Sequence, residues 1–411
     1  MIKALYISYN AITEPIVQSQ VIPYLRELSK KDIKFYLLTF EKKRMKKEEK
    51  NKIQNMLRKE FHGGPDLEWF SLNYHKRPTV PATLFDIIVG CIYSIFIIIK
   101  NKIDVIHARA IVAALAGYPA AKMLSKKFIF DTRGIDSEEY VDGDLWKRGG
   151  FKHKMVALSE NGLIKSADHV IVLTERFLKI LSQKYRDRKI EFSVIPCAVD
   201  TDRFKPKKAK NSNAALAEKL GIRNKFVIVY TGSLGTWYMF SEMIDFFKIA
   251  VRLIKNAHFL ILTQSDKTYA ANLIKKKGLD MRHVTVTEAP STAVPDYLAV
   301  CDIGIFFIKP VFSKLSSSPV KFAEYLSSGL PVVINACIGD TERMVKRYNL
   351  GTIVDEFNDE GYTKALKALM KMIEGERDAL KSRCRIVAER ELSLKMATEK
   401  YYKVYASLLK T

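Results

Sequence analysis

The stretch SSSPVKFAEYLSSGLPVVIN, residues 316–335, places the strongest limit on the fold of this chain. Ser318 is a favoured helix cap, and Pro319 suits the first helical position. Gly329 can end this helix in a left-handed conformation, and the following run, 331–334, begins with a proline that forbids its continuation. Its β-branched residues are typical of a strand covered on both faces. A short helix that leads into such a strand indicates a parallel α/β sheet.

Two polar residues interrupt this structural pattern. Lys321 is expected in the first helical turn, where the helix dipole disfavours a cation. A bound anion over the helix start would explain it. Glu324 lies one turn later on nearly the same side, where its carboxylate can accept hydrogen bonds from sugar hydroxyls. The alternative is a solvated surface pair, and the spacing alone leaves both interpretations open.

The rest of the chain alternates buried strands with helices, which predicts two α/β halves. A Pro/Val phrase at 192–204 and a Lys-, Ala- and Asn-rich segment at 205–223 separate the halves. No G-x-G-x-x-G motif is present, so nothing supports a dinucleotide site. Strands are predicted at 3–8, 34–40, 104–109, 128–130 and 167–174 in the first half, and at 226–230, 258–263, 284–287, 303–307 and 331–334 in the second.

Polar residues gather where two consecutive strands of the first half end. His107 and Arg109 close the strand at 104–109, and Asp131 and Arg133 follow the next strand. Ligands of open α/β sheets bind at the carboxyl ends of strands. Each residue alone is more typical of an ion pair, but the cluster predicts a site.

In the second half, Gly232 and Ser233 follow a buried strand directly. A glycine there permits a tight turn and a close approach of the backbone to a ligand. A helix predicted from about residue 241 would point its start into the same space, which is a phosphate-cradling arrangement. A simple strand-to-helix turn is the alternative.

The net charge of +23 predicts an anionic partner: nucleic acid, anionic lipid or a phosphorylated substrate. The lysine-rich segment 41–59 is either a solvated helix face or a patch for lipid headgroups. It lacks the interleaved aromatic residues that single-stranded nucleic acid binding uses, and we predict no nucleic-acid partner. Five scattered cysteines are expected to be buried in a reducing compartment, and the start lacks a signal sequence. We therefore expect a cytoplasmic protein, with a peripheral position at the inner face of the membrane as an extension.

Two further segments keep alternatives open. The apolar run 84–99 is shorter than the ~20 residues that span a bilayer. It predicts a core helix, or else an interfacial helix, since basic residues flank it at 76–77 and 100–102. The acidic segment 136–150 is expected to be a solvated loop, or to supply Asp136 or Glu139 for deprotonation of an acceptor.

The 316–335 stretch resembles the donor-binding segment of retaining glycosyltransferases of the two-domain GT-B architecture, family 4 in particular. The phrase at 192–204 is similar to that family's V-I-P-N-G-V-D linker entry. The chain departs from the family at Ser316, where a glutamate is common, and at Arg133-Gly134, where many members have His-Gly. The matching positions are Pro319, Lys321, Glu324, Tyr325, Gly329, Pro331, Val332 and Val333.

The resemblance implies two Rossmann-like domains that face a cleft. Residues 1–200 would bind the acceptor, 201–390 would bind a nucleotide-sugar, and a helix at 391–411 would pack back on the first domain. The reaction would be transfer of the sugar with retention of configuration, with no metal and no cofactor besides the nucleotide-sugar co-substrate. The acceptor would be a glycan or a lipid-linked glycan, as in the assembly of a bacterial surface polysaccharide.

The resemblance also suggests roles for single residues. The donor diphosphate would meet Lys321 and the turn at 232–233, near Ser318, and Glu324 would hold the ribose. The catalytic candidates are His107, Asp131 and Arg133, and the acceptor-binding candidates are Gln18, Ser19 and Arg109. Ser19 has an alternative role as the cap of a helix predicted over 20–28.

Two other functions remain as alternatives. A nucleotide-sugar epimerase shares the GT-B architecture but requires paired acids and bases, which the sequence does not display. A basic protein that binds a membrane or nucleic acid without catalysis is the second alternative.

Overall fold

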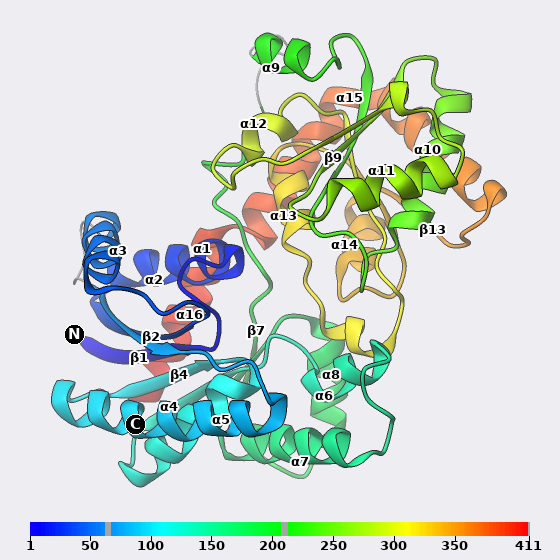
Figure 1. Cartoon of the computed structure of the whole chain (residues 1–411). Helices are drawn as coiled ribbons and strands as arrows, with labels where there is room; N and C mark the ends of the chain where they lie inside the picture. The colour runs from blue at the N-terminus through cyan, green and yellow to red at the C-terminus, as the bar shows by residue number, and fades with distance from the viewer. Residues whose placement is uncertain (62–66, 207–212, 410–411) are drawn as a thin grey trace. The chain divides into compact units, whose positions relative to one another are not determined.

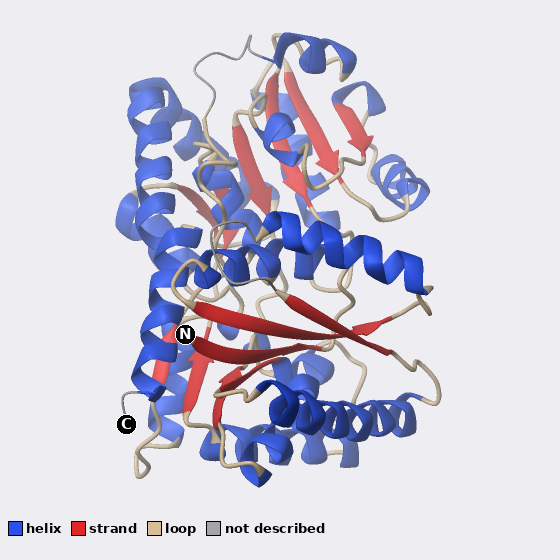
Figure 2. Cartoon of the chain, turned by 90° about the vertical axis from the view of Figure 1, so that its left-hand side faces the viewer, coloured by secondary structure: helices blue, strands red, loops and turns tan. Residues whose placement is uncertain are grey.

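The computed structural model describes residues 1–61, 67–206 and 213–409 and divides into two compact units (Figure 1). Unit 1 comprises Met1–Pro196 together with Leu394–Thr411, and unit 2 comprises Cys197–Ser393. Each unit holds one parallel β-sheet that is covered by helices (Figure 2). The predicted fold class, two Rossmann-like α/β domains, is confirmed.

The sheet of unit 1 has seven strands in the order β3-β2-β1-β4-β5-β6-β7. The chain runs from β1 to one edge, returns through a long helix to β4, and continues to the other edge. The order therefore reverses between β1 and β4, which is where ligands of such sheets bind. The strands are β1 Ile2–Ser8, β2 Ile33–Glu41, β3 Glu68–Asn73, β4 Val105–Arg109, β5 Lys127–Asp131, β6 His169–Val172 and β7 Phe192–Val194.

The short helices of unit 1 differ from the predictions at two places. The helix expected over 20–28 is interrupted at Val21, since Pro23 lacks the N–H group that a continuous helix would use. The expected acidic loop at 136–150 begins with a helix. The helices are α1 Pro15–Gln20, α2 Ile22–Ser29, α3 Lys47–Glu60, α4 Thr79–Asn101, α5 Ala110–Met123, α6 Asp136–Asp142, α7 Phe151–Ser166, α8 Glu175–Lys184 and α16 Leu394–Leu409.

Helix α4 is longer than the sequence predicted, because it extends beyond both ends of the apolar run 84–99. It has 23 residues and is, within the described residues, the one helix that is long and apolar enough to cross a membrane by length and composition. The statement that the segment is too short to span a bilayer was therefore wrong for the whole helix. About 33% of its most apolar window is buried in unit 1.

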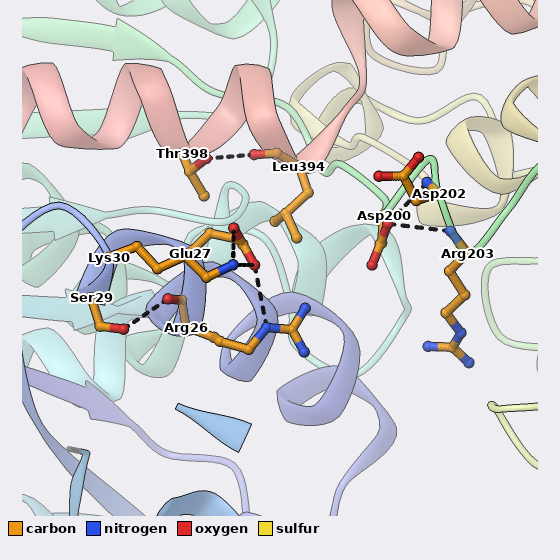
Figure 3. A network of polar contacts seen from close by, with 9 residues as sticks. All are labelled: Arg26, Glu27, Ser29, Lys30, Asp200, Asp202, Arg203, Leu394 and Thr398. Atoms are coloured by element: carbon orange, nitrogen blue, oxygen red, sulfur yellow. Dashed lines mark hydrogen bonds and ion pairs between the residues drawn. The ribbon is translucent and has the colours of Figure 1, made fainter. Parts of the chain in front are cut away.

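The last helix, α16, belongs to unit 1, as the resemblance implies. It packs against α2, where the rings of Tyr24 and Tyr401 meet edge to face at 5.8 Å. In its first turn Thr398 donates a hydrogen bond to the carbonyl of Leu394 at 2.8 Å (Figure 3). The side chains of Tyr401 and Tyr405 point into the unit and are buried.

The sheet of unit 2 has six strands in the order β10-β9-β8-β11-β12-β13. Gly304 in the central strand β11 permits close packing, since a Cβ there would lie 2.3 Å from the ring of Tyr325. The strands are β8 Phe226–Thr231, β9 Ala257–Leu262, β10 Val284–Thr287, β11 Ile303–Phe306, β12 Val332–Asn335 and β13 Gly351–Val354.

The entry to unit 2 is a turn that Asp200 fixes. Its carboxylate accepts the backbone N–H groups of Asp202 at 3.0 Å and Arg203 at 3.3 Å (Figure 3). Of the five cysteines that were expected to be buried, Cys197, Cys301 and Cys384 are buried, Cys91 is partly buried and Cys337 is exposed. The helices of unit 2 are α9 Ala214–Lys219, α10 Phe240–Leu253, α11 Lys267–Lys276, η2 Met281–His283, α12 Val294–Leu298, η3 Phe312–Ser316, α13 Val320–Ser327, α14 Thr341–Tyr348 and α15 Asp359–Glu391.

Candidate functional site

Lys321 is the central feature of unit 2, because its ammonium is buried among aromatic rings. It is the second residue of α13 and is 6% exposed. Its Nζ lies 3.5 Å from the ring centroid of Tyr238 and 4.4 Å from that of Tyr230. It also donates a hydrogen bond of 3.3 Å to the Tyr230 hydroxyl. The electron-rich faces of these rings attract a cation.

The surroundings of Lys321 suit an anionic ligand. Burial lowers its pKa well below the usual value, and Glu324 opposes that shift only in part. A buried ammonium is costly unless an opposite charge compensates it. A phosphate group at the start of α13 would supply that charge and would also meet the positive end of the helix dipole.

The structure brings the turn after β8 against this lysine. Gly232 has φ +134°, a conformation that favours glycine, and a Cβ at this position would lie 2.7 Å from the Lys321 Nζ. The turn is fixed by the Thr231 N–H, which donates to the Tyr325 hydroxyl at 2.8 Å, and by the Ser233 carbonyl, which accepts from Tyr230. Gly232, Ser233 and Lys321 thus share one place, as the phosphate-cradling interpretation requires.

A second buried lysine lies in the same segment of unit 2. Lys314 in η3 is 5% exposed, and its Nζ lies 3.7 Å from the ring centroid of Trp237. The sequence did not indicate that the rings of Trp237 and Tyr238 contact Lys314 and Lys321. The pair of adjacent aromatic residues after a glycine-containing turn is the sequence signal that could have indicated these contacts.

Glu324 is partly buried one turn beyond Lys321. Burial raises the pKa of its carboxyl group to about 7, although Lys321 and Arg203 act in the opposite direction. Near neutral pH this group exchanges between an acid and a carboxylate. Both forms can make hydrogen bonds with the hydroxyls of a sugar.

Ser318 is not the helix cap that the sequence predicted. Pro319 takes the cap position in an extended conformation, so the helix begins one residue later, at Val320. The Ser318 hydroxyl instead accepts the backbone N–H of Cys197 at 3.1 Å. Its side chain therefore holds the linker entry beside the start of α13.

In unit 1, the ends of β4 and β5 bring four predicted residues together. Arg109 and Asp131 are register partners in neighbouring strands. The Asp131 carboxylate accepts hydrogen bonds from Tyr401 at 3.0 Å and from Arg133 at 3.4 Å. Burial opposes ionisation of Asp131, but Arg133 and His107 lower its pKa to about 2. It is therefore a carboxylate at neutral pH.

His107 lies beneath α16 and does not reach solvent. Its Nδ1 lies 2.7 Å from the Tyr405 hydroxyl, and its Nε2 lies 3.7 Å from the Asp131 carboxylate. Burial lowers the pKa of His107, so the ring is neutral at pH 7. Since His107 and Asp131 are 1% and 0% exposed, the geometry favours a positioning role for both rather than contact with a substrate.

Arg109 and Arg133 are the cations of this cluster. Asp131 holds Arg133, whose backbone adopts the left-handed conformation with φ +58°. The Nε of Arg109 has no hydrogen-bond partner within the described parts of the chain. A left-handed backbone conformation such as that of Arg133 is strained, and strained conformations are often found at functional sites. Both guanidinium groups suit a phosphate or carboxylate ligand.

Gln18 and Ser19 lie inside α1, and their side chains make hydrogen bonds with nearby backbone carbonyls. Gln18 donates to the carbonyl of Ile12 at 2.7 Å, and Ser19 donates to that of Pro15 at 2.8 Å. Val21, and not Ser19, precedes α2, so the alternative role of Ser19 as a helix cap was wrong. Acceptor contact by these two side chains stays a prediction.

Asp136 has the carboxyl group with the most perturbed pKa near this cluster, although the sequence indicated a role for it only as an alternative. It is the first residue of α6. Burial and the carboxylates of Glu160 and Glu139 raise its pKa to about 8, whereas a hydrogen bond with the Ile111 backbone and the charge of Arg109 act to lower the pKa. One carboxyl oxygen, Oδ2, is buried and has no partner in the described residues. An acid that titrates near neutral pH is suited to proton transfer.

Two family models match the chain, one in each half. The model described as Glycosyltransferase Family 4 matches residues 20–203, and the model described as Glycosyl transferases group 1 matches residues 225–372. Among curated proteins, none matches this sequence.

Solved structures show the same fold over nearly the whole chain. Sucrose-phosphate synthase from Thermosynechococcus elongatus has a TM-score of 0.74 at 13% identity and covers 100% of both chains. HepE from Anabaena, in complex with UDP-glucose, has a TM-score of 0.69 at 16% identity and covers 99% of this chain and 100% of its own.

A third structure is WaaG, a glycosyltransferase involved in lipopolysaccharide biosynthesis, with a TM-score of 0.70 at 14% identity. The alignment covers 98% of this chain and 99% of WaaG. Together with the two domain matches and the two Rossmann-like sheets, these findings identify the chain as a glycosyltransferase with the GT-B fold.

Proposed function

We propose that this enzyme transfers a sugar from a nucleotide-sugar to a glycan or lipid-linked acceptor with retention of configuration. The observation that carries the proposal is the buried, aromatic-lined ammonium of Lys321 against Gly232 at the start of α13. This arrangement fits a diphosphate better than it fits a neutral ligand. The HepE structure contains UDP-glucose, which supports a nucleotide-sugar as donor.

In the donor half, the chemistry requires stabilisation of the departing diphosphate. As the bond from the anomeric carbon to the phosphate oxygen breaks, the bonding electrons move to the diphosphate. Lys321, Lys314 and the backbone around 232–233 would bind the growing negative charge. Glu324 would orient the donor through hydroxyl groups of its ribose. We expect these lysines to provide the charge that a divalent metal provides elsewhere, so EDTA should leave transfer unchanged.

In the acceptor half, the geometry suggests separate tasks for cations and acids. Arg109 and Arg133 would bind an anionic group of the acceptor. Asp131 and His107 would position Arg133 from beneath. Asp136 is our candidate for receiving the proton of the acceptor hydroxyl. Its pKa of about 8 makes the carboxylate, the form that can accept this proton, the minor form at pH 7 and the main form above pH 8.

We further propose a cytoplasmic role in assembling a bacterial surface polysaccharide. WaaG, which shares the fold, is involved in lipopolysaccharide biosynthesis. The net charge of +23 suits an acceptor that carries phosphate, such as a lipid-diphosphate-linked glycan.

An assay of nucleotide release tests the proposal. The enzyme is incubated with a panel of UDP-, GDP- and ADP-sugars, with and without lipid-diphosphate-linked glycan acceptors, and products are identified by mass spectrometry. We expect release that depends on acceptor and a product heavier by one sugar. Interconversion of the donor without acceptor would instead identify an epimerase. Salt-sensitive binding of polyanions without turnover of any donor would identify a non-catalytic binding protein.

Glu324 should make nucleotide affinity depend on pH. With a pKa of about 7 it is mostly protonated at pH 6 and ionised at pH 8, and a carboxylate accepts stronger hydrogen bonds from ribose. We expect UDP affinity to rise several-fold from pH 6 to pH 8. Glu324→Gln should bind about tenfold more weakly at pH 8, since a hydrogen bond to a charged group contributes about 1.5 kcal/mol.

Calorimetry of both proteins at both pH values separates this effect from titration of the UDP phosphate, which affects both proteins equally. Equal affinity of the native protein and Glu324→Gln at pH 8, with unchanged circular dichroism, would refute the role of Glu324.

A further inference from the structure

We propose that the outer face of α4 docks unit 1 onto a membrane surface that contains anionic lipids. We name this surface the α4 face and define it by six apolar side chains, each between 48% and 63% exposed: Leu84, Phe85, Ile88, Ile92, Phe96 and Ile99.

The α4 face is a continuous stripe. Leu84, Ile88, Ile92 and Phe96 follow each other at intervals of four residues, so they lie along one side of the helix. At 1.5 Å per residue, the 23 residues of α4 extend for about 35 Å. Isolated exposed apolar residues are ordinary, but an uninterrupted row of large ones marks an interaction surface.

The opposite side of α4 is fixed to the unit, so the helix lies on a membrane and does not cross it. Asp86 is buried and accepts the Tyr9 hydroxyl at 2.7 Å and the His75 backbone N–H at 3.0 Å. Gly90 faces Phe40 and Ala116 so closely that a Cβ would lie 2.9 Å from the Phe40 ring. Removing α4 from the unit would leave Asp86 unpaired, which is costly in hydrocarbon.

Basic residues at both ends of α4 indicate that the membrane is anionic. Lys76 and Arg77 precede the helix, and Lys100 and Lys102 end it, and all four are exposed. The Lys100 Nζ lies 5.5 Å from the Phe96 ring, so its charge lies beside the apolar face. Asp86 is the charged residue of α4 that precedes Lys100, and its side chain is buried. Such a combination is typical of helices that lie in the interface of anionic membranes.

A second apolar row lies on the nearby helix α7. Phe151, Met155 and Leu158 are exposed at intervals of four and three residues. Helix α5 packs against both α4 and α7, and Figure 1 shows the three helices in one region of unit 1. A groove next to Leu158 includes Lys165, Lys184 and Arg188, together with Asp187. Apolar and basic residues are thus exposed together on this part of unit 1 as well.

A bilayer explains these features better than a second protein does. A protein partner, including a second copy of this chain, would require acidic groups opposite the basic residues at both ends of α4. Anionic lipid headgroups provide them along the whole length of the helix. The contact of Asp86 with Tyr9, which follows β1 at the reversal point of the sheet, also connects the docked helix to the strand ends that hold Arg109.

Vesicle binding by the full-length protein tests the proposal. The probe is large unilamellar vesicles of phosphatidylglycerol and phosphatidylcholine in equal amounts, with pure phosphatidylcholine as comparison. We expect sedimentation with the anionic vesicles, and at least a tenfold weaker partition for Leu84→Gln/Ile88→Gln/Ile92→Gln. Ile92→Trp should show a blue-shifted emission increase when these vesicles are added, whereas a purely electrostatic contact would not shift it.

The matched control is Ile386→Gln, which replaces an apolar residue of unit 2 that is 57% exposed. It should bind vesicles as the native protein does. Equal binding by the triple variant and the native protein overturns the proposal. Absence of vesicle binding by the native protein also overturns the proposal. A dimer that light scattering detects and that the triple variant abolishes would, in that case, assign the α4 face to a second copy of the chain. Circular dichroism melting confirms that the variants are folded.

Discussion

Lys321→Met should lower kcat/KM for the nucleotide-sugar by about 100- to 1000-fold, the range for loss of one group that stabilises developing negative charge. Methionine occupies a similar volume between the Tyr230 and Tyr238 rings but cannot compensate a phosphate. Initial-rate kinetics measure the loss, and calorimetry with UDP measures the accompanying loss of nucleotide affinity.

The same substitution should not destabilise the fold, which separates this effect from misfolding. The variant removes a buried charge whose pKa is lowered by burial, so we expect an unchanged or higher melting temperature. Lys309→Met is the matched control, because Lys309 lies near Lys314 in sequence but is exposed. If Lys321→Met bound UDP and turned over the donor like the native enzyme, the donor site would have to be sought elsewhere.

Lys321 should also couple nucleotide binding to proton uptake. Burial lowers the pKa of its amine well below the usual value, whereas a bound diphosphate favours the ammonium and should raise that pKa again. Titrations of UDP at pH 8 in two buffers of different ionisation enthalpy should therefore give different heats. This difference should decrease in Lys321→Met.

Asp131→Asn should lower the stability of unit 1 by about 3 kcal/mol, since it removes the fully buried carboxylate of the ion pair with Arg133. For a unit of this size that corresponds to a melting temperature lower by about 6–12 °C. Calorimetric or circular dichroism melts measure the shift. The control is Asp187→Asn, because Asp187 pairs with Arg186 at an exposed position and should leave the melt unchanged.

The pH dependence of this effect has a definite sign. The pKa of Asp131 is about 2 in the folded protein and 3.8 as a free group, so its contribution is fully present above pH 4. It is lost as the pH falls from about 4 towards 2. The difference in stability between the native protein and Asp131→Asn should therefore narrow over that interval. A melt of Asp131→Asn within 1 °C of the native protein at pH 7 would show that Asp131 is not the buried counter-charge.

Much of the architecture was predictable from local patterns. β-branched runs separated by amphipathic segments indicated two α/β halves, and Gly329, with φ +73°, ends α13 as its position after the helix suggested. Thr174, a residue type favoured at this position, caps α8 by accepting the Phe177 N–H. These features depend on residues a few positions apart, which a sequence displays directly.

The candidate site was predictable only in part. The sequence indicated Lys321 and the turn at Gly232, which the structure brings together. It did not indicate that Tyr230, Tyr238 and Trp237 surround the lysines, because the partners come from β8, its following loop, η3 and α13. It also treated His107 and Asp131 as groups that meet a substrate, whereas Tyr405 and Tyr401 from the last helix cover them.

The sequence by itself determined the fold class, the short helix that carries Lys321 in its first turn, and the cations available for a phosphorylated ligand. Tertiary structure alone decided which charges are buried, which are paired and which side of α4 faces outward. The physical reason is that periodicity and capping act between neighbours along the chain. Desolvation and ion pairing depend on segments that meet only after folding, such as Asp131 and Tyr401.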